Sequence, residues 1–242
     1  FISIIAALSI LIVSDPSYPL ECLNSRPLFA IDANADQPSD IAIGPDGDVY
    51  LVDGVNDRIL VMDADGGLKL AFGESGTEEG RFNRPVGNGI SADGNVFVAD
   101  SGNHRIQAFD AAGNYLYMFT VKTPSDAKPA DPVDVLASAF KNRLYVSDND
   151  NHKIKVFTRN GDFVLEWGRF GEGPGEFRYP GILATNEYNQ VFVVDVLNTR
   201  IQVFDPFGNH INDIGAWGVR PGQLFRPKGV VVDGQNRVFV SD

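Results

Sequence analysis

The sequence predicts an all-β protein, a β-propeller made of four-stranded antiparallel blades. Two markers carry this prediction, because both recur at the same interval of 47 or 48 residues. An interval of this length is typical of one propeller blade. Helical repeats of similar length would need apolar residues every three to four positions, and the sequence lacks that pattern. The first marker is a strand-like run that ends in Asp (49–53, 96–100, 144–148, 191–195 and 238–242), and the second is a proline (Pro38, Pro85, Pro132, Pro180 and Pro227).

Each interval contains four predicted strands in a constant order. A short apolar strand follows the proline, and a turn rich in Asp, Gly and Asn leads into the Val-aromatic-Val strand. Those turn residues tolerate the left-handed backbone of tight hairpins. The third strand alternates as a half-buried strand should, and the fourth ends in a large apolar residue. The repeats are therefore 37–84, 85–131, 132–179, 180–226 and a truncated one at 227–242.

The second repeat resembles the NHL-repeat family of β-propellers. Residues 94–109 read Gly-Asn-Val-Phe-Val-Ala-Asp-Ser-Gly-Asn-His-Arg-Ile-Gln-Ala-Phe, a near-complete match to the family pattern, and the resemblance extends over about residues 37–242. It implies six blades in the full protein, with about four and a half present here. We therefore expect a fragment of an exported, bacterial-like member of the family.

The third repeat departs from this pattern at two places. Residues 139–142 replace the Asp-Gly turn, and the loop 120–131 lacks the Gly-x-Phe element found at 80–82 and 175–177. These departures are local, so the same blade is expected.

The N-terminal segment predicts export. The apolar run 1–13 is too short for a comfortable membrane span but suits the core of a signal peptide, so 1–21 is expected to be a leader. The alternatives are an uncleaved anchor, which would be the sole membrane contact, or a buried core segment. Residues 22–36 form a lead-in whose segment 27–31 is expected to be the latch strand of the last blade. A periplasmic, cell-surface or extracellular location follows.

Composition limits the partners of the chain. Lys and Arg total 20 against 32 Asp and Glu, which gives a net charge of −12 and opposes binding to nucleic acid. One cysteine, Cys22, excludes an internal disulfide framework and a Cys-ligated zinc site, and leaves a lone thiol or a lipid attachment point. The RNA-binding function of similar NHL domains in tripartite-motif ubiquitin ligases needs a basic face and is disfavoured here.

The turn between the second and third strands of each repeat supplies polar side chains to one face of the propeller. These side chains are candidates for ligand binding. The alternative is structural: each Asp accepts N–H bonds in its own turn or pairs with the Arg or Lys five residues on. The candidates are Asp53, Asn56, Asp57, Asp100, Asn103, His104, Asp148, Asn151, His152, Asp195 and Asn198.

The loops that connect successive repeats are expected to share this face. They vary most between repeats, and variable loops on a rigid scaffold commonly carry recognition. The alternative to ligand binding is that each residue of these loops supports a neighbouring blade. The candidates are Arg84, Phe170, Arg178, Tyr179, Trp217 and Arg226.

Metal binding and catalysis form the alternative hypothesis. His104 and His152 occupy the same turn position in adjacent repeats, where similar propeller lyases hold metal-binding His residues. A catalytic zinc generally has three protein ligands, and the other repeats have Asp57 and Thr199 at this position. We therefore expect no cofactor, with zinc or calcium as the alternative, and see no nucleophile motif.

The sequence thus favours a noncatalytic binding or scaffold propeller that recognises a protein, peptide or glycan. The alternative is a metal-dependent lyase or lactonase, since both activities occur on similar six-bladed propellers.

Overall fold

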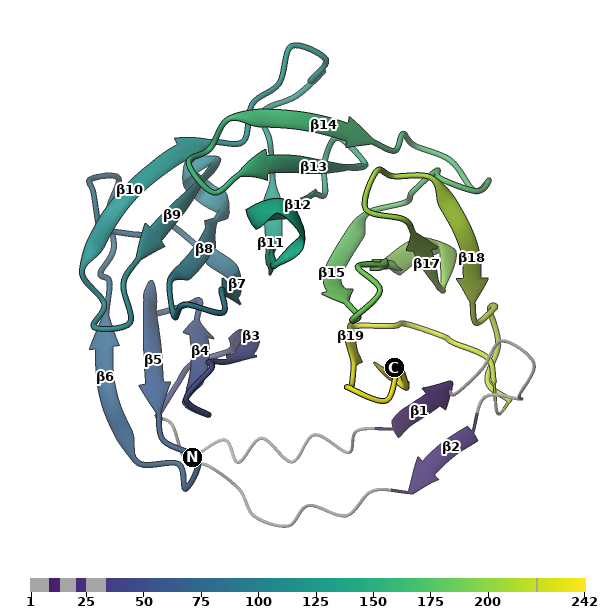
Figure 1. Cartoon of the computed structure of the whole chain (residues 1–242), viewed down its shortest axis with the longest axis horizontal. Coiled ribbons are helices and arrows are strands. Elements are labelled where there is room, and N and C mark those ends of the chain that lie inside the picture. The colour runs from purple at the N-terminus through teal and green to yellow at the C-terminus, as the bar shows by residue number, and fades with distance from the viewer. Residues whose placement is uncertain (1–8, 14–20, 25–33, 221) are drawn as a thin grey trace. The chain divides into compact units, whose positions relative to one another are not determined.

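The computed structural model describes residues 34–220 and 222–242 in full and the backbone of 9–13 and 21–24. Across these residues the secondary structure consists of β-strands and three single-turn 3₁₀ helices, so the expected all-β propeller fold is confirmed (Figure 1). The described part of the chain holds no helix with the length and apolar character needed to cross a membrane.

Four sheets follow the repeats predicted from the sequence, each with four antiparallel strands in chain order. Blade 1 contains β3 (Pro38–Ile43), β4 (Val49–Asp53), β5 (Arg58–Met62) and β6 (Leu68–Phe72). Blade 2 contains β7 (Pro85–Ile90), β8 (Val96–Asp100), β9 (Arg105–Phe109) and β10 (Tyr115–Thr120). Blade 3 contains β11 (Pro132–Ser138), β12 (Arg143–Asp148), β13 (Lys153–Thr158) and β14 (Phe163–Trp167). Blade 4 contains β15 (Pro180–Thr185), β16 (Val191–Asp195), β17 (Arg200–Phe204) and β18 (His210–Ile214).

The fifth sheet combines strands from both ends of the chain. Its order is β19 (Gly229–Val232), β20 (Val238–Ser241), β1 (Ser9–Val13) and β2 (Glu21–Asn24). β1 pairs antiparallel with both β20 and β2. β1 thus lies inside the segment 1–21, for which a leader remains a prediction. The expected latch strand 27–31 lies outside the described residues.

The chain divides into two compact units. The central unit comprises the described residues of 31–151 together with 155–164, and the terminal unit comprises the described residues of 1–30 with 152–154 and 165–242. The central unit holds blades 1 and 2, and the terminal unit holds blade 4 and the fifth sheet. Blade 3 contributes residues to both units. Within the central unit, the first strands β3, β7 and β11 of successive blades are neighbours.

The two sequence markers keep the same interval because they are cross-strand partners. Proline lacks an N–H, so it begins the first strand without leaving a ladder donor unpaired. A register shift follows it in each blade, which is a β-bulge where the strand starts. The pairs are Pro38 with Asp53, Pro85 with Asp100, Pro132 with Asp148 and Pro180 with Asp195.

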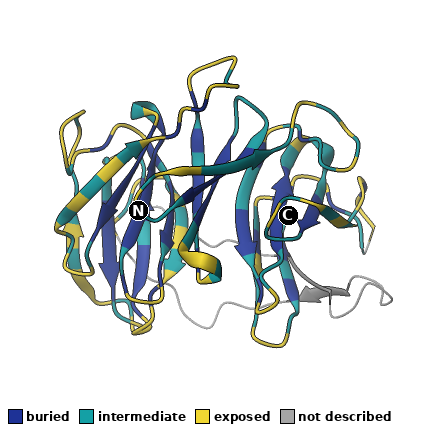
Figure 2. Cartoon of the chain, turned by 45° about the horizontal axis from the view of Figure 1, so that its top comes forward, coloured by how far each residue is buried: buried dark blue, intermediate teal, exposed yellow. Residues whose placement is uncertain are grey.

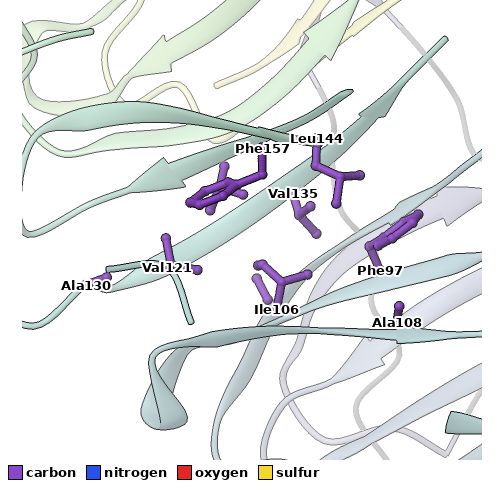
Figure 3. Packing of buried hydrophobic residues seen from close by; sticks show 10 residues of the cluster. Phe97, Ile106, Ala108, Val121, Ala130, Val135, Leu144 and Phe157 are labelled. Carbon is purple, nitrogen blue, oxygen red and sulfur yellow. The ribbon is translucent and has the colours of Figure 1, made fainter. Parts of the chain in front are cut away.

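The core consists of apolar layers between neighbouring blades. In the central unit, the buried side chains of Phe97 and Ile106 in blade 2 belong to one cluster with Leu144 and Phe157 in blade 3 (Figure 3). Buried residues follow the strands, while the turns are exposed (Figure 2). The close approach of β7 to β11 depends on glycine, because a Cβ on Gly89 would stand 2.1 Å from the Val135 carbonyl oxygen.

The departures of the third repeat have a structural counterpart. Lys155 on β13 is fully buried, and its Nζ donates to Asp126 Oδ2 at 2.7 Å and to the Val121 carbonyl at 2.8 Å. It also lies 2.6 Å from Asp148 Oδ2. Burial alone would raise the pKa of Asp126, but hydrogen bonds from Lys155 and the Thr123 N–H outweigh it and hold that pKa below its usual value. The charged Lys155 therefore fastens a loop that lacks the Gly-x-Phe element.

Blades 2 and 4 use a neutral glutamine at the position of Lys155. Gln107 Nε2 donates to the Arg81 carbonyl at 2.6 Å, and its Oε1 accepts the Gly80 N–H at 3.0 Å. Gln202 makes the same pair of bonds, to Glu176 and Gly175, at 2.7 and 2.9 Å. The side chain on the third strand and the type of connecting loop therefore change together.

Candidate functional site

In blades 1 to 4, the aspartate that ends the second strand is buried rather than presented to a ligand. Asp53, Asp100, Asp148 and Asp195 all have no exposed surface. Buried carboxylates are costly unless hydrogen bonds and cations satisfy them. The surroundings of these four side chains show how that requirement is met.

In blade 2, Asp100 is the centre of a satisfied network. Its Oδ1 accepts the Asn83 N–H at 2.8 Å. Its Oδ2 accepts from Asn103 Nδ2 at 2.9 Å, from Arg105 Nε at 2.7 Å and from Gln107 Nε2 at 3.1 Å. The network joins the turn after β8 to the loop that precedes β7.

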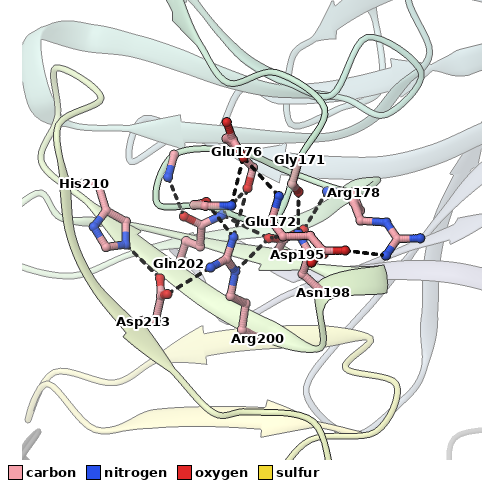
Figure 4. A network of polar contacts seen from close by, with 12 residues as sticks. Gly171, Glu172, Glu176, Arg178, Asp195, Asn198, Arg200, Gln202, His210 and Asp213 are labelled. Carbon is pink, nitrogen blue, oxygen red and sulfur yellow. Dashed lines mark hydrogen bonds and ion pairs between the residues drawn. The ribbon is translucent and has the colours of Figure 1, made fainter.

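Blade 4 repeats this arrangement around Asp195 (Figure 4). Asp195 Oδ1 accepts the Arg178 N–H at 2.8 Å. Oδ2 accepts from Asn198 at 2.9 Å, from Arg200 Nε at 2.9 Å and from Gln202 at 3.0 Å. The arginine five residues after the aspartate pairs as the structural hypothesis expects.

Blade 1 follows the same plan, whereas blade 3 differs. Asp53 accepts from Arg58 Nε at 2.8 Å and from Asn56 Nδ2 at 3.0 Å. In blade 3 the cation that pairs with Asp148 is Lys155, seven residues on. Lys153, which lies five residues on, donates instead to Glu166 at 2.7 Å. The four aspartates and their asparagine partners thus fasten turns.

The fourth turn residue has a left-handed backbone and reaches the next connecting loop. The φ values are 51° at Asp57, 58° at His104 and 56° at His152. Asp57 Oδ1 accepts the Arg84 N–H at 2.8 Å. His152 Nδ1 accepts the Tyr179 N–H at 3.2 Å. Asp57 and His152 therefore each hold the connecting loop that follows in their own unit.

The two histidines are held in opposite tautomers when neutral. His104 Nδ1 contacts the Ala130 carbonyl oxygen, which can only accept, so this nitrogen carries the proton. His152 Nδ1 accepts an N–H, so the proton of its neutral ring is on Nε2. Among the described residues, no three His, Cys, Asp or Glu side chains are grouped as metal ligands would be.

The connecting loops of the terminal unit carry large exposed aromatic side chains at their tips. Ser75, Phe170 and Trp217 are equivalent, because each forms an isolated parallel bridge with the buried residue seven positions on. The side chain at this tip is a serine in the central unit. In the terminal unit, Phe170 is 63% exposed and Trp217 is 70% exposed. We call residues 168–179 and the described residues of 215–226 the two aromatic loops.

The aromatic loop before blade 4 is organised around His152. The centroid of its imidazole ring lies 5.1 Å from that of Phe170 and 4.8 Å from that of Tyr179. The Arg178 guanidinium lies 6.0 Å from the Phe170 ring centroid and pairs with Glu172 at 3.2 Å. The structure therefore brings four of the predicted candidates together in the terminal unit.

The other predicted loop arginines contact neighbouring side chains. Arg84 Nη2 donates to Ser101 Oγ at 3.0 Å and to Asp131 Oδ1 at 3.1 Å. Arg226 lies 5.7 Å from the ring centroid of Phe225. Among the exposed apolar residues of the terminal unit that sequence reasoning missed, Leu197 follows β16, and Val219 and Phe225 lie in the loop that carries Trp217. The signal was available, since the aligned blade 2 positions are Gly102, Thr77 and Asn83.

Comparisons with known proteins agree with this fold. The family described as NHL repeat matches residues 82–109, and a family described as 6-bladed beta-propeller matches residues 122–189. No curated protein matches the sequence of the chain. The chain is thus a β-propeller that carries NHL repeats.

Solved structures of similar fold include enzymes. A catalytically inactive virginiamycin B lyase from Staphylococcus aureus with quinupristin matches with a TM-score of 0.66 and 14% identity, over 99% of this chain and 80% of that one. A selenomethionine-substituted virginiamycin B lyase from the same organism matches with 0.62 and 16%, over 92% and 69%. Kuenenia stuttgartiensis hydrazine synthase matches with 0.57 and 11%, over 86% and 55%. At these identities the likeness concerns the fold alone.

Proposed function

We propose that the protein is a noncatalytic, exported propeller that binds a protein, peptide or glycan through its two aromatic loops. The observation that carries this proposal is the exposure of Phe170 and Trp217 at equivalent loop tips. Large aromatic side chains contribute most to recognition, because they bury much apolar area and offer a π-face to sugars, peptides and cations.

The backbone of both aromatic loops supports the proposal because it is already ordered by hydrogen bonds. In the first loop, the Phe177 N–H donates to the Arg169 carbonyl at 2.8 Å. In the second, the Leu224 N–H donates to the Ala216 carbonyl at 2.9 Å. Phe177 and Leu224 are themselves buried. A preorganised loop loses little conformational entropy when a ligand binds.

The buried aspartates narrow the binding residues to these loops. Asp100 and Asp195 have their oxygens engaged by the fold, so a ligand would have to break a buried network to reach them. The proposal therefore rests on Phe170, Tyr179 and Trp217, with Arg178 and Arg226 as the neighbouring cations. Nucleic acid is not a proposed partner, because the chain carries a net charge of −12.

The experiment combines two ligand sources with one matched set of variants. The protein is screened on a glycan array and against a phage-displayed peptide library. The test variant is Phe170→Ser with Trp217→Ser, because Ser75 is the natural residue at the equivalent tip. The control is Leu116→Ser, a 43% exposed apolar residue on β10. We expect the double variant to weaken binding of any selected ligand by about tenfold or more.

Two results would contradict the proposal. If neither source yields a ligand, the proposed binding function is wrong. Equal affinity of the wild type and the double variant would place the binding site elsewhere on the protein.

A metal-dependent lyase or lactonase is the alternative, and the fold likeness to virginiamycin B lyase favours it. The candidate ligands for zinc or calcium are then His104 in the central unit and His152 in the terminal unit, and the Nδ1 atom of each contacts a backbone group of its own unit. The test is elemental analysis by mass spectrometry of protein purified without chelator, with a His104→Ala, His152→Ala variant as the control. A stoichiometric metal that the variant loses would support this alternative over the noncatalytic proposal.

A further inference from the structure

A cleft of about 280 Å³ lies in the central unit at the ends of strands opposite to the aspartate turns. Its walls come from the turn between β7 and β8, the turn between β11 and β12, and Arg159 in the turn after β13. The second of these turns is the departure 139–142 noted in the sequence. The volume is close to the lower end of the range of small-molecule pockets, roughly 300–1,000 Å³.

Cations gather at this cleft although the chain as a whole is acidic. Arg143 and Arg159 line it, and Lys141 lies in the same turn as Arg143. Asp93 is the one carboxylate among the lining residues. Two guanidinium groups against one carboxylate leave the lining positively charged, in contrast to the net charge of −12 of the chain.

Arg159 is fixed in position by its neighbours in blade 2. Its Nη1 pairs with Asp93 Oδ2 at 3.0 Å, its Nη2 donates to Ser91 Oγ at 3.4 Å, and its guanidinium lies 5.7 Å from the Phe97 ring centroid. Hydrogen bonds from Ser91 and Arg159 lower the pKa of Asp93. A guanidinium has five N–H donors, so Asp93 and Ser91 engage only part of its capacity.

This arginine is specific to blade 3. The equivalent positions in the other full repeats are Ala64, Ala111 and Pro206. None of those side chains could span to a neighbouring blade. Of the four full repeats, the third is therefore the one that has both the altered turn and an arginine at this position.

The altered turn holds the second guanidinium and a buried hydroxyl. Arg143 is half-buried and lies 5.7 Å from the Phe140 ring centroid. Ser138, which is 8% exposed, accepts the Phe140 N–H at 3.2 Å. A hydroxyl can still donate its own hydrogen while it accepts. Ser91 also lines the cleft, but its hydroxyl donates to Asp93 Oδ1 at 2.7 Å and helps to hold that carboxylate in place.

We propose that this cleft binds the phosphate or carboxylate group of a small molecule, held by Arg143 and Arg159 with Ser138 as a hydroxyl donor. Planar guanidinium groups match both oxyanions with paired N–H donors, and partial burial strengthens such bonds. The site shares no residue with the aromatic loops, so it does not depend on the proposed function.

The test is isothermal titration calorimetry of the whole chain in low-salt neutral buffer. Inorganic phosphate probes the phosphate arm, and succinate probes the carboxylate arm. We expect heat from at least one of them, and affinity about tenfold weaker in Arg159→Ala, which installs the residue of blade 2. Arg143→Gln is the second variant, since it keeps hydrogen-bonding capacity while it removes charge.

Two controls separate this site from general electrostatics. Arg81→Gln makes the same charge change on an exposed arginine that pairs with Glu74 at 2.9 Å, and should leave affinity unchanged. Asp93→Asn removes the competing carboxylate and should strengthen binding. The proposal is overturned if neither probe binds, if Arg81→Gln weakens binding as much as Arg159→Ala, or if Asp93→Asn weakens it.

Discussion

The loops 73–84 and 168–179, which precede blades 2 and 4, share a set of buried contacts, here called the frame. They differ in the exposed side chains at their tips. In both, an arginine on the third strand donates to two loop carbonyls: Arg105 Nη2 to Glu78 and Arg81, and Arg200 Nη2 to Gly173 and Glu176. Both loops also begin with a glycine of positive φ, 93° at Gly73 and 103° at Gly168. A Cβ there would press on the buried ring of Phe82 or Phe177.

The difference lies in the side chains that this frame exposes. The loop of the central unit presents Ser75 and Thr77, while the loop of the terminal unit presents Phe170 and Glu172. Because the frame is fastened from inside by buried groups, its exposed positions are free to vary without loss of fold. Changes to the frame should therefore cost stability, and changes at the tips should cost binding.

The largest effect is expected where the frame departs from the repeat, at Lys155. Lys155→Gln installs the residue of blades 2 and 4 but leaves Asp126 and Asp148 buried without their cation. Removing one partner of a buried ion pair costs about 3–5 kcal/mol, and we expect a loss in this range from urea unfolding. Adding Asp126→Asn should restore part of the loss, because one buried carboxylate is then neutral. A Lys155→Gln variant as stable as the wild type would contradict this account.

Sequence reasoning predicted the frame far better than the tips. The 47-residue interval and the Pro and Asp markers determined the strand order, because each marker has a fixed structural role at a strand end. The same patterns could not show that Asp100 and Asp195 are wholly buried, since burial depends on the loop that folds over them. Lys155 was not singled out either: the substitution of Gln by Lys is visible, but its partner Asp126 lies in a loop without a repeat to align.

A smaller effect on the free energy of unfolding is expected from pH, and we expect it to arise in the central unit. Burial raises the pKa of Asp40 on β3 to about 6, although its carboxylate accepts the Asn88 N–H at 2.7 Å. The folded state therefore binds a proton more tightly than the unfolded state, whose value is 3.8. The contribution of Asp40 to stability rises as pH falls from 7 towards 4, by about 1–3 kcal/mol.

The measurement is the free energy of unfolding in urea at pH 7, 6, 5 and 4, for the wild type and for Asp40→Asn. The amide oxygen of the variant can still accept the Asn88 N–H, and the variant should lose this part of the pH dependence. The aligned residues of the terminal unit are Ile182 and Gly229, which cannot titrate. If the free energy of unfolding of the two proteins depends on pH in the same way, Asp40 is not the source of the pH dependence.

The smallest effect on stability is expected at the tips, and it tests the comparison most directly. Phe170 and Trp217 are mostly exposed, and substitutions at such positions usually change the free energy of unfolding by less than about 0.5 kcal/mol. The Phe170→Ser, Trp217→Ser variant should therefore unfold at the same urea concentration as the wild type while it loses ligand affinity. A loss of several kcal/mol would show that these rings belong to the frame. The aromatic loops would then be structural, because the serine found at the central-unit tip could not replace them.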